Sequence, residues 1–339
     1  MFDVLKEHHF HDHYNNGFVE TNMTLPDALV DEIRQHYLAK AKGHNDFPKF
    51  FVNNEHQAYL EGRTIGMVLN AFPKMGKNLV KKFYDRAYDK AVYCDQVFVE
   101  RVLEHLLENG FQKFFKTRYM VAAYDMYLRN NHHSPAAGIH TDLPNFHHFY
   151  ETENDLSIYI PLVDLDQDNG GRLSVLPEAK LKVPGNVLLK LLYEHFSKNQ
   201  QCLDEKGYID PGAIGPSAIT AFAKSKPHQD LMSIYKGVIG LAKSQYANEF
   251  RKTVETKGKV LIFSNKNFHA AEPWKNEQLD REIYVIRMFP IYDAKIKLPR
   301  QLHGTLVNNF LIDMEEGIVH RYADPVDFAR IPEEAKLKL

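Results

Sequence analysis

The spacing of apolar residues predicts helices in the first third of the chain. After Leu25-Pro26, apolar side chains recur on one helical stripe, and Val97 to Leu107 repeats the same period. We therefore expect residues 25–112 to be largely helical. The short segment Gly17 to Glu20 before them has the pattern of a strand.

From residue 118 onward, β-branched and aromatic residues replace the helical period. This change predicts strands at 118–129, 156–163, 173–176, 259–263 and 283–291. A polar stretch that ends in Asn169-Gly170-Gly171 predicts the turn of a hairpin between the second and third of these strands. The fourth strand is almost continuously apolar, which is typical of a strand buried between two packed layers.

A segment with helical spacing separates the third and fourth strands. Because the strands are joined by tight turns or long excursions rather than by regular crossover helices, we expect an antiparallel sheet. The predicted fold class is an all-β core with added helices, in the form of a double-stranded β-helix of the jelly-roll or cupin-like kind. The expected layout is a single domain over 1–339, with a mainly helical N-terminal region at 1–115, a core at 116–183 and 258–295, a helical insert at 184–257 and a C-terminal extension at 296–339.

Composition narrows the functional classes. The 42 Lys+Arg and 44 Asp+Glu residues leave a net charge of -2, so no global field favours nucleic acid or a membrane surface, and we expect a small-molecule partner. Only Cys94 and Cys202 are present, which excludes a disulfide framework and suits a reducing compartment. Without a secretory leader or an apolar run of membrane-spanning length, the expected location is cytoplasmic, and the oligomeric state stays open.

Three side chains form a candidate metal site. In an extended segment, His140 and Asp142 project from the same face because they are two residues apart, and His269 follows the apolar strand 259–263. Two imidazoles and one carboxylate on one face of an octahedron leave three positions open. This arrangement suits Fe(II) that must hold a chelating cosubstrate and then dioxygen.

The order of these parts resembles that of the Fe(II)- and 2-oxoglutarate-dependent dioxygenases, most closely the phytanoyl-CoA dioxygenase-like branch. The motifs that carry the resemblance are Gly17-Phe18-Val19, His140-Thr141-Asp142, the turn at Asn169-Gly170-Gly171 that leads to Pro177, the strand Gly258 to Phe263, His269 and Arg281. They cover about half of the chain. The sequence departs from the family pattern at Glu178-Ala179-Lys180, where the family has Gly-Ser-His, and in its long insert.

The resemblance implies a hydroxylase that acts on an unactivated C–H bond of a small molecule and releases succinate and CO2. Its cofactors would be Fe(II), 2-oxoglutarate as cosubstrate and O2, with His140, Asp142 and His269 as metal ligands and catalytic residues. Arg281 would hold the distal carboxylate of 2-oxoglutarate through its guanidinium fork. Arg287 lies on the same strand face as a rival or second anion-binding group, and Tyr127 is the candidate on the flanking strand.

Asp142 also disfavours halide transfer, because related halogenases lack this carboxylate. Desaturation, epimerisation and ring formation stay open, as does the identity of the substrate. Two other classes remain as alternatives: a cupin-type metal enzyme that does not use 2-oxoglutarate, and a non-catalytic jelly-roll binding protein. Release of succinate separates the first from the proposed class, and metal content separates the second.

Overall fold

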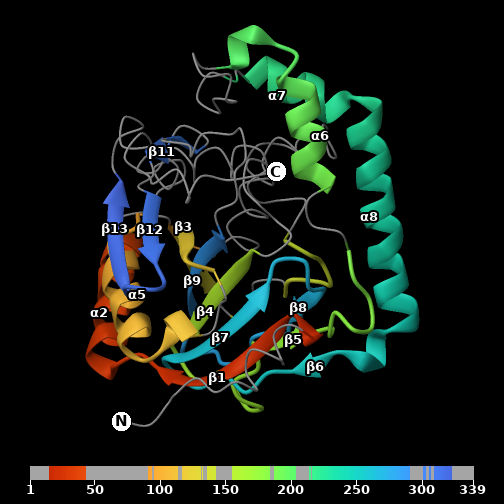
Figure 1. Cartoon of the computed structure of the whole chain (residues 1–339). Coiled ribbons are helices and arrows are strands. Elements are labelled where there is room, and N and C mark those ends of the chain that lie inside the picture. The colour runs from red at the N-terminus through yellow and green to blue at the C-terminus, as the bar shows by residue number, and fades with distance from the viewer. Residues whose placement is uncertain are drawn as a thin grey trace.

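Strand β9 (Arg281–Pro290) lies at the centre of the larger sheet in the computed structural model (Figure 1). It pairs antiparallel with β3 (Tyr119–Asn130) on one side and with β4 (Leu156–Pro161) on the other. The sheet runs in the order β1-β7-β4-β9-β3-β12-β13, and β2 also pairs with β3. Its other strands are β1 (Phe18–Thr24), β2 (Ala91–Tyr93), β7 (Lys259–Ser264), β12 (Asn309–Asp313) and β13 (Ile318–Tyr322).

The structure describes most of this sheet and its surroundings, but not every residue of the chain. The described residues are 15–42, 91–93, 95–113, 117–130, 132, 136–142, 155–183, 187–203, 214, 216–290, 301–302, 305–306 and 309–322. The predicted helical stretch between 43 and 90 lies outside them.

A smaller sheet faces the centre of the larger one. It consists of β6 (Arg251–Lys252), β5 (Leu173–Val175) and β8 (His269–Ala271), with β5 in the middle. Along the chain, β4 belongs to the larger sheet, β5 and β6 to the smaller, β7 to the larger, β8 to the smaller and β9 to the larger. All of these pairings are antiparallel, which confirms the prediction of an antiparallel sheet. A separate two-stranded pair joins β10 (Gln301–Leu302) to β11 (Thr305–Leu306).

The larger sheet is covered on both faces, and this explains its apolar strands. In β7, Val260 and Ile262 join the apolar core on one face, whereas Leu261 and Phe263 join the core on the other. The first core lies under helices α2 (Asp27–Lys42) and α5 (Val99–Glu108), and the second lies between the two sheets. The strand at 259–263 is therefore buried between two layers, as its continuous hydrophobicity predicted.

The region between β5 and β7 forms a further layer (Figure 1). Helices α6 (Val187–Phe196), α7 (Pro216–Lys224) and α8 (Lys226–Gln245) share a core of their own. Short 3-10 turns lie at η2 (Phe111–Lys113), η3 (Gln200–Cys202) and η5 (Ala247–Glu249). No helix within the described residues is both long and apolar enough to cross a membrane.

Two segments differ from the layout expected from sequence. The range 184–257 is not purely helical, because Arg251–Lys252 pairs with β5 and completes the smaller sheet. Within the expected C-terminal extension, residues 309–322 join the larger sheet, since β12 pairs with β3 and β13 pairs with β12. Both segments form hydrogen bonds with the backbone groups of a strand that would otherwise lie at a sheet edge. Neither segment carries a turn or motif from which its partner strand could be predicted.

The packing of α2 on the sheet yields a stability prediction. Ile33 of α2 is fully buried, whereas Ile234 of α8 is 60% exposed. We expect Ile33→Ala to lower the free energy of unfolding by about 2–5 kcal/mol, and Ile234→Ala to change it by less than about 0.5 kcal/mol. Urea titration followed by circular dichroism measures both. Equal losses in the two variants would show that α2 does not pack on the sheet in solution.

Candidate metal centre

The segment that carries His140 and Asp142 runs alongside β8. His140 and His269 form an antiparallel bridge in which each backbone N–H donates to the carbonyl of the other, at N···O distances of 3.0 and 2.9 Å. The backbone N–H of Asp142 donates to the carbonyl of Asn265 at 3.1 Å. This pairing extends the smaller sheet by one more strand-like segment and brings the two histidines directly opposite each other.

The three predicted side chains converge. Asp142 Oδ1 lies 3.6 Å from His140 Nε2 and 3.7 Å from His269 Nε2, and one ligand atom from each residue lies within 4.8 Å of the others. Donor atoms bound at right angles around an ion at about 2.1 Å lie about 3 Å apart, so a small inward movement would close the set. The side chains of Asp142 and His269 are buried, and that of His140 is 34% exposed, so the cluster opens to solvent at His140.

The hydrogen bonds of the two imidazoles fit a cation between them. His140 Nδ1 lies 2.6 Å from the carbonyl of Gly138, and His269 Nδ1 lies 3.0 Å from the carbonyl of Asn267. Because a carbonyl only accepts, each Nδ1 carries a proton, so in the neutral imidazole the Nε2 that faces Asp142 holds the lone pair. In that form the two Nε2 atoms and the carboxylate oxygen face one another, which is the arrangement that metal-binding histidines adopt.

The electrostatics agree with that assignment. Burial, assisted by the neighbouring His140, lowers the pKa of His269 to about 4, so its imidazole is neutral at pH 7. Burial alone would raise the pKa of Asp142, but Arg287 and the two histidines outweigh it and hold the pKa of this carboxyl below its usual value. The cluster therefore offers a neutral imidazole at His269 and a carboxylate at Asp142, which are the protonation states that metal binding requires.

Arg287 lies beside this cluster. Its Nη2 is 2.6 Å from Asp142 Oδ2, so the carboxylate directs one oxygen to the guanidinium and the other to the imidazoles. Arg287 Nη1 also contacts Ser157 and Asn265, and Asn265 donates to Asp155 at 2.7 Å. These contacts fix the orientation of Asp142.

Arg281 lies on the same face of β9 but in different surroundings. Its Nε donates to the carbonyl of Gly171 at 2.8 Å, and its Nη2 donates to the hydroxyl of Tyr159 at 2.7 Å. Ile283 and Val285, which lie between the two arginines on the same face of β9, belong to the core between the sheets. Both arginines are buried and therefore point into the interior of the fold, as their spacing predicted.

Tyr127 requires a correction. Its ring stacks on Tyr37 of α2 with centroids 4.5 Å apart, and its hydroxyl donates to Glu282 at 2.9 Å. Glu282 also pairs with Arg34 of α2 at 2.7 Å. The side chain thus lies in the core between the larger sheet and the helices, on the face opposite to the metal-ligand cluster, and cannot contact a cosubstrate there.

Sequence reasoning overlooked the polar residues around the cluster. Ser157 is a buried serine among the aliphatic and aromatic residues of β4, and Asn265 and Asn267 lie in the polar run before His269. A lone polar residue in a buried strand is a usable signal, because burial costs free energy unless the group is hydrogen-bonded.

Comparison with known proteins gives only distant likeness. Neither a family model nor a curated protein matches the sequence. Among solved structures, the non-haem alpha-ketoglutarate-dependent carbocyclase SnoK from nogalamycin biosynthesis is similar, with 11% identity, 84% of each chain covered and a TM-score of 0.45. HygX from Streptomyces hygroscopicus, with nickel and 2-oxoglutarate bound, has 11% identity, covers 86% of this chain and 90% of its own, and also scores 0.45. Scores of this size do not establish a family.

The cluster predicts a histidine-dependent metal affinity. We expect His140→Ala and His269→Ala each to weaken Mn(II) binding by more than about 100-fold, because removal of even an outer-shell partner costs about 10–100-fold. His320→Ala, in an exposed position on β13, is the matched control and should bind Mn(II) like the wild type. Isothermal titration calorimetry measures the three dissociation constants. Equal affinities in all variants would rule out this cluster as the metal site.

The position of Tyr127 yields a second prediction. Tyr127→Phe removes a buried donor from Glu282 and should lower the free energy of unfolding by about 1–3 kcal/mol. Because the side chain lies on the helix-covered face, Mn(II) affinity should not change. A variant that kept its stability but lost metal affinity would place Tyr127 at the site instead.

Proposed function

We propose that this protein is a non-haem Fe(II)- and 2-oxoglutarate-dependent oxygenase that hydroxylates an unactivated C–H bond of a small molecule. One observation carries the proposal. Two imidazoles, each with Nδ1 bonded to a backbone carbonyl, direct Nε2 toward a single carboxylate oxygen between two antiparallel sheets. A set of two histidines and one carboxylate is the ligand set of Fe(II) oxygenases, which leaves coordination positions for substrate molecules.

The fold supports the proposal at the level of topology. From β4 to β9 the chain passes repeatedly between the larger and the smaller sheet, with β5 and β6 both in the smaller one, and all of these strands pair antiparallel. We infer that the two sheets are the walls of a single double-stranded β-helix domain, with α2 and α5 outside one wall. Fold alone does not define an activity, so the site has to carry the functional argument.

Each residue of the site has a distinct part. His140, Asp142 and His269 would hold Fe(II), which supplies the activation of dioxygen when it is bound with 2-oxoglutarate. Arg287 orients Asp142, so that only Oδ1 faces the imidazoles. Arg281 would bind the distal carboxylate of the oxoacid, because a guanidinium fork matches a carboxylate in two parallel hydrogen bonds.

The contacts of the two arginines favour Arg281 as the residue that binds the distal carboxylate. Arg287 is already paired with a metal-ligand carboxylate at 2.6 Å. Arg281 instead donates to two neutral oxygens, from Gly171 and Tyr159, which an anionic ligand can replace. Phe263, which lies 5.2 Å from the ring of His269 and 6.2 Å from that of Tyr159, forms the apolar wall between the metal cluster and Arg281.

Binding and turnover test the proposal. With the Mn(II)-loaded protein under anaerobic conditions, 2-oxoglutarate should bind one per chain. With Fe(II), O2 and a substrate screen, at least one small molecule should stimulate the release of succinate. Metal binding without oxoacid binding would favour the cupin-type enzyme, and the absence of both would favour a binding protein.

A pair of matched substitutions separates the two arginines. Arg281→Lys removes the fork and should weaken 2-oxoglutarate binding by about 10–100-fold, equivalent to about 1.5–3 kcal/mol, while it leaves Mn(II) affinity unchanged. Arg287→Lys should instead weaken Mn(II) binding, because Asp142 loses the group that orients it. Calorimetric titration of metal and oxoacid measures both constants. The reverse pattern would assign the oxoacid to Arg287.

A further inference from the structure

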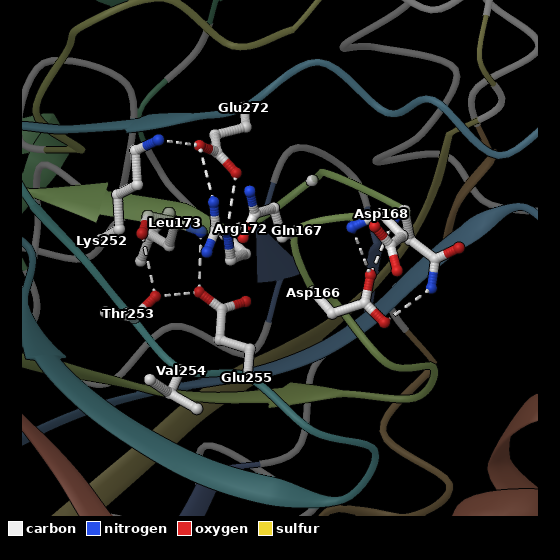
Figure 2. A network of polar contacts seen from close by, with 12 residues as sticks. Asp166, Gln167, Asp168, Arg172, Leu173, Lys252, Thr253, Val254, Glu255 and Glu272 are labelled. Carbon is white, nitrogen blue, oxygen red and sulfur yellow. Dashed lines mark hydrogen bonds and ion pairs between the residues drawn. The ribbon is translucent and has the colours of Figure 1, made fainter.

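A buried carboxyl group lies next to Arg281 and has no part in the site described so far. Glu255 is 3% exposed and lies in the segment between β6 and β7, where its backbone bridges to Leu165. Figure 2 shows its side chain directed toward Thr253 and the backbone of Leu173, away from the exposed residue Val254. The backbone N–H of Leu173 donates to Glu255 Oε1 at 2.7 Å, and the Thr253 hydroxyl contacts the same oxygen.

The other oxygen of Glu255 is the unusual feature. Oε2 is buried, and within the described residues it makes no hydrogen bond of ordinary geometry, although the side chain of Tyr159 lies close enough to interact with the carboxyl group. The hydroxyl of Tyr159 interacts with this carboxyl group and also accepts from Arg281 Nη2 at 2.7 Å. Arg281, Tyr159 and Glu255 therefore form a chain of neighbouring polar groups within the interior. A charged carboxylate with an unsatisfied oxygen is costly in such a place, whereas a neutral carboxyl group is not.

A second carboxylate nearby provides the contrast. Glu272 on the chain after β8 accepts from Arg172 Nε at 2.8 Å and pairs with Lys252 Nζ at 2.7 Å (Figure 2). Its side chain is 19% exposed, and its two cations hold the pKa below the usual value despite partial burial. Glu255 makes no such ion pair within the described residues, and burial raises its pKa to about 7, against the opposing effects of Thr253 and Arg281.

We propose that Glu255 takes up a proton when a dicarboxylate binds beside Arg281, and that this coupling makes the interior selective for ligands with a distal carboxylate. The inference rests on the proposed function, since it concerns the same oxoacid site. Arg281 carries one positive charge. If Glu255 stayed ionised, the ligand carboxylate and Glu255 would be two like charges around one guanidinium in a region of low dielectric.

The proton also changes what Tyr159 can do. While Glu255 is ionised, its carboxylate accepts and Tyr159 directs its O–H toward it. Once Glu255 is neutral, its own O–H can donate to the oxygen of Tyr159, and the Tyr159 proton becomes available to the ligand carboxylate. One proton on Glu255 thus removes a repulsion and adds a hydrogen bond to the ligand.

The groups that face Glu255 come from every element around it. They are Thr253 from its own segment, Tyr159 from β4, Arg281 from β9, and Arg172 from the start of β5, which senses the charge of Glu255 while paired with Glu272. Among these, burial raises the pKa of Tyr159 well above its usual value, and the arginines stay protonated. Glu255 is therefore the member of this group that exchanges a proton near neutral pH.

The sign of the effect follows from linkage. Since ligand binding raises the proton affinity of Glu255, the oxoacid should bind more tightly as the pH falls. Above pH about 7, the affinity should drop by up to about tenfold per pH unit. Below pH 7 the carboxyl group is already largely neutral, and the dependence should level off.

Proton-linked calorimetry tests this directly. The full-length Mn(II)-loaded protein is titrated with 2-oxoglutarate at pH 6.5, 7.5 and 8.5, in buffers of different ionisation enthalpy, which gives the number of protons taken up. We expect uptake to rise toward one proton per ligand at pH 8.5. Glu255→Gln should show no uptake and should bind the oxoacid about tenfold or more tightly than the wild type at pH 8.5. Glu272→Gln, a matched change at the ion-paired carboxylate, should behave like the wild type.

The outcomes separate this inference from the function on which it rests. If 2-oxoglutarate binds without proton uptake, and Glu255→Gln keeps the wild-type pH dependence, the coupling is wrong and the proposed function stands. If 2-oxoglutarate binds to neither protein at any of these pH values, while Mn(II) still binds, the proposed function fails and the inference fails with it. Should Glu255→Gln not fold, the proton count of the wild type decides the question alone.

Discussion

The reciprocal backbone pairing between His140 and His269 is the constraint on which the site depends. Two hydrogen bonds of 3.0 and 2.9 Å fix these residues opposite each other, although 128 positions separate them along the chain (269 minus 140, less one). Because side chains alternate along an extended segment, the same register carries Asp142 to the face of His140. A slip of one residue would turn all three donors away from one another. The register of the smaller sheet therefore sets the relative positions of the three candidate metal ligands, and the larger sheet contributes the side chains around them.

Charge compensation explains how the interior between the two sheets accommodates its ionised side chains. Arg287 lies against Asp142, and Arg281 connects to Glu255 through Tyr159. Each arginine has a carboxyl group close by, which limits the cost of burying a charge. The outer face of the sheet follows the same rule, since Glu282 pairs with Arg34 of α2. Strand β9 thus places charged side chains on both faces of the sheet, and each of them lies close to a group of opposite charge on a different element of the fold.

The sequence was a good guide to elements whose signal is local. Strand positions follow from alternation or continuous apolarity, and the pair His140 and Asp142 follows from spacing along one segment. The face of Tyr127 could not be found in this way, because a bulge between Ala122 and Tyr124 shifts the alternation in β3. Val121 lies in the core between the sheets, so strict alternation would place residue 127 there too, yet it packs under the helices. The neighbours of Glu255 come together only when the two sheets pack against each other, and the periodicity of the sequence does not indicate such contacts.

The two interior carboxyl groups differ in a way that assigns their chemistry. Asp142 meets a full guanidinium and two imidazoles, which keep its pKa low and its charge permanent. Glu255 shares its cation through a tyrosine hydroxyl, and burial raises its pKa to about 7. A permanent charge suits a group that must hold a cation, whereas a proton that exchanges near neutral pH suits a group that must admit an anion. In the proposed oxygenase, the separation of these two environments along one face of β9 would let a single interior hold a metal at one end and an oxoacid at the other, without either carboxyl group competing for the other's partner.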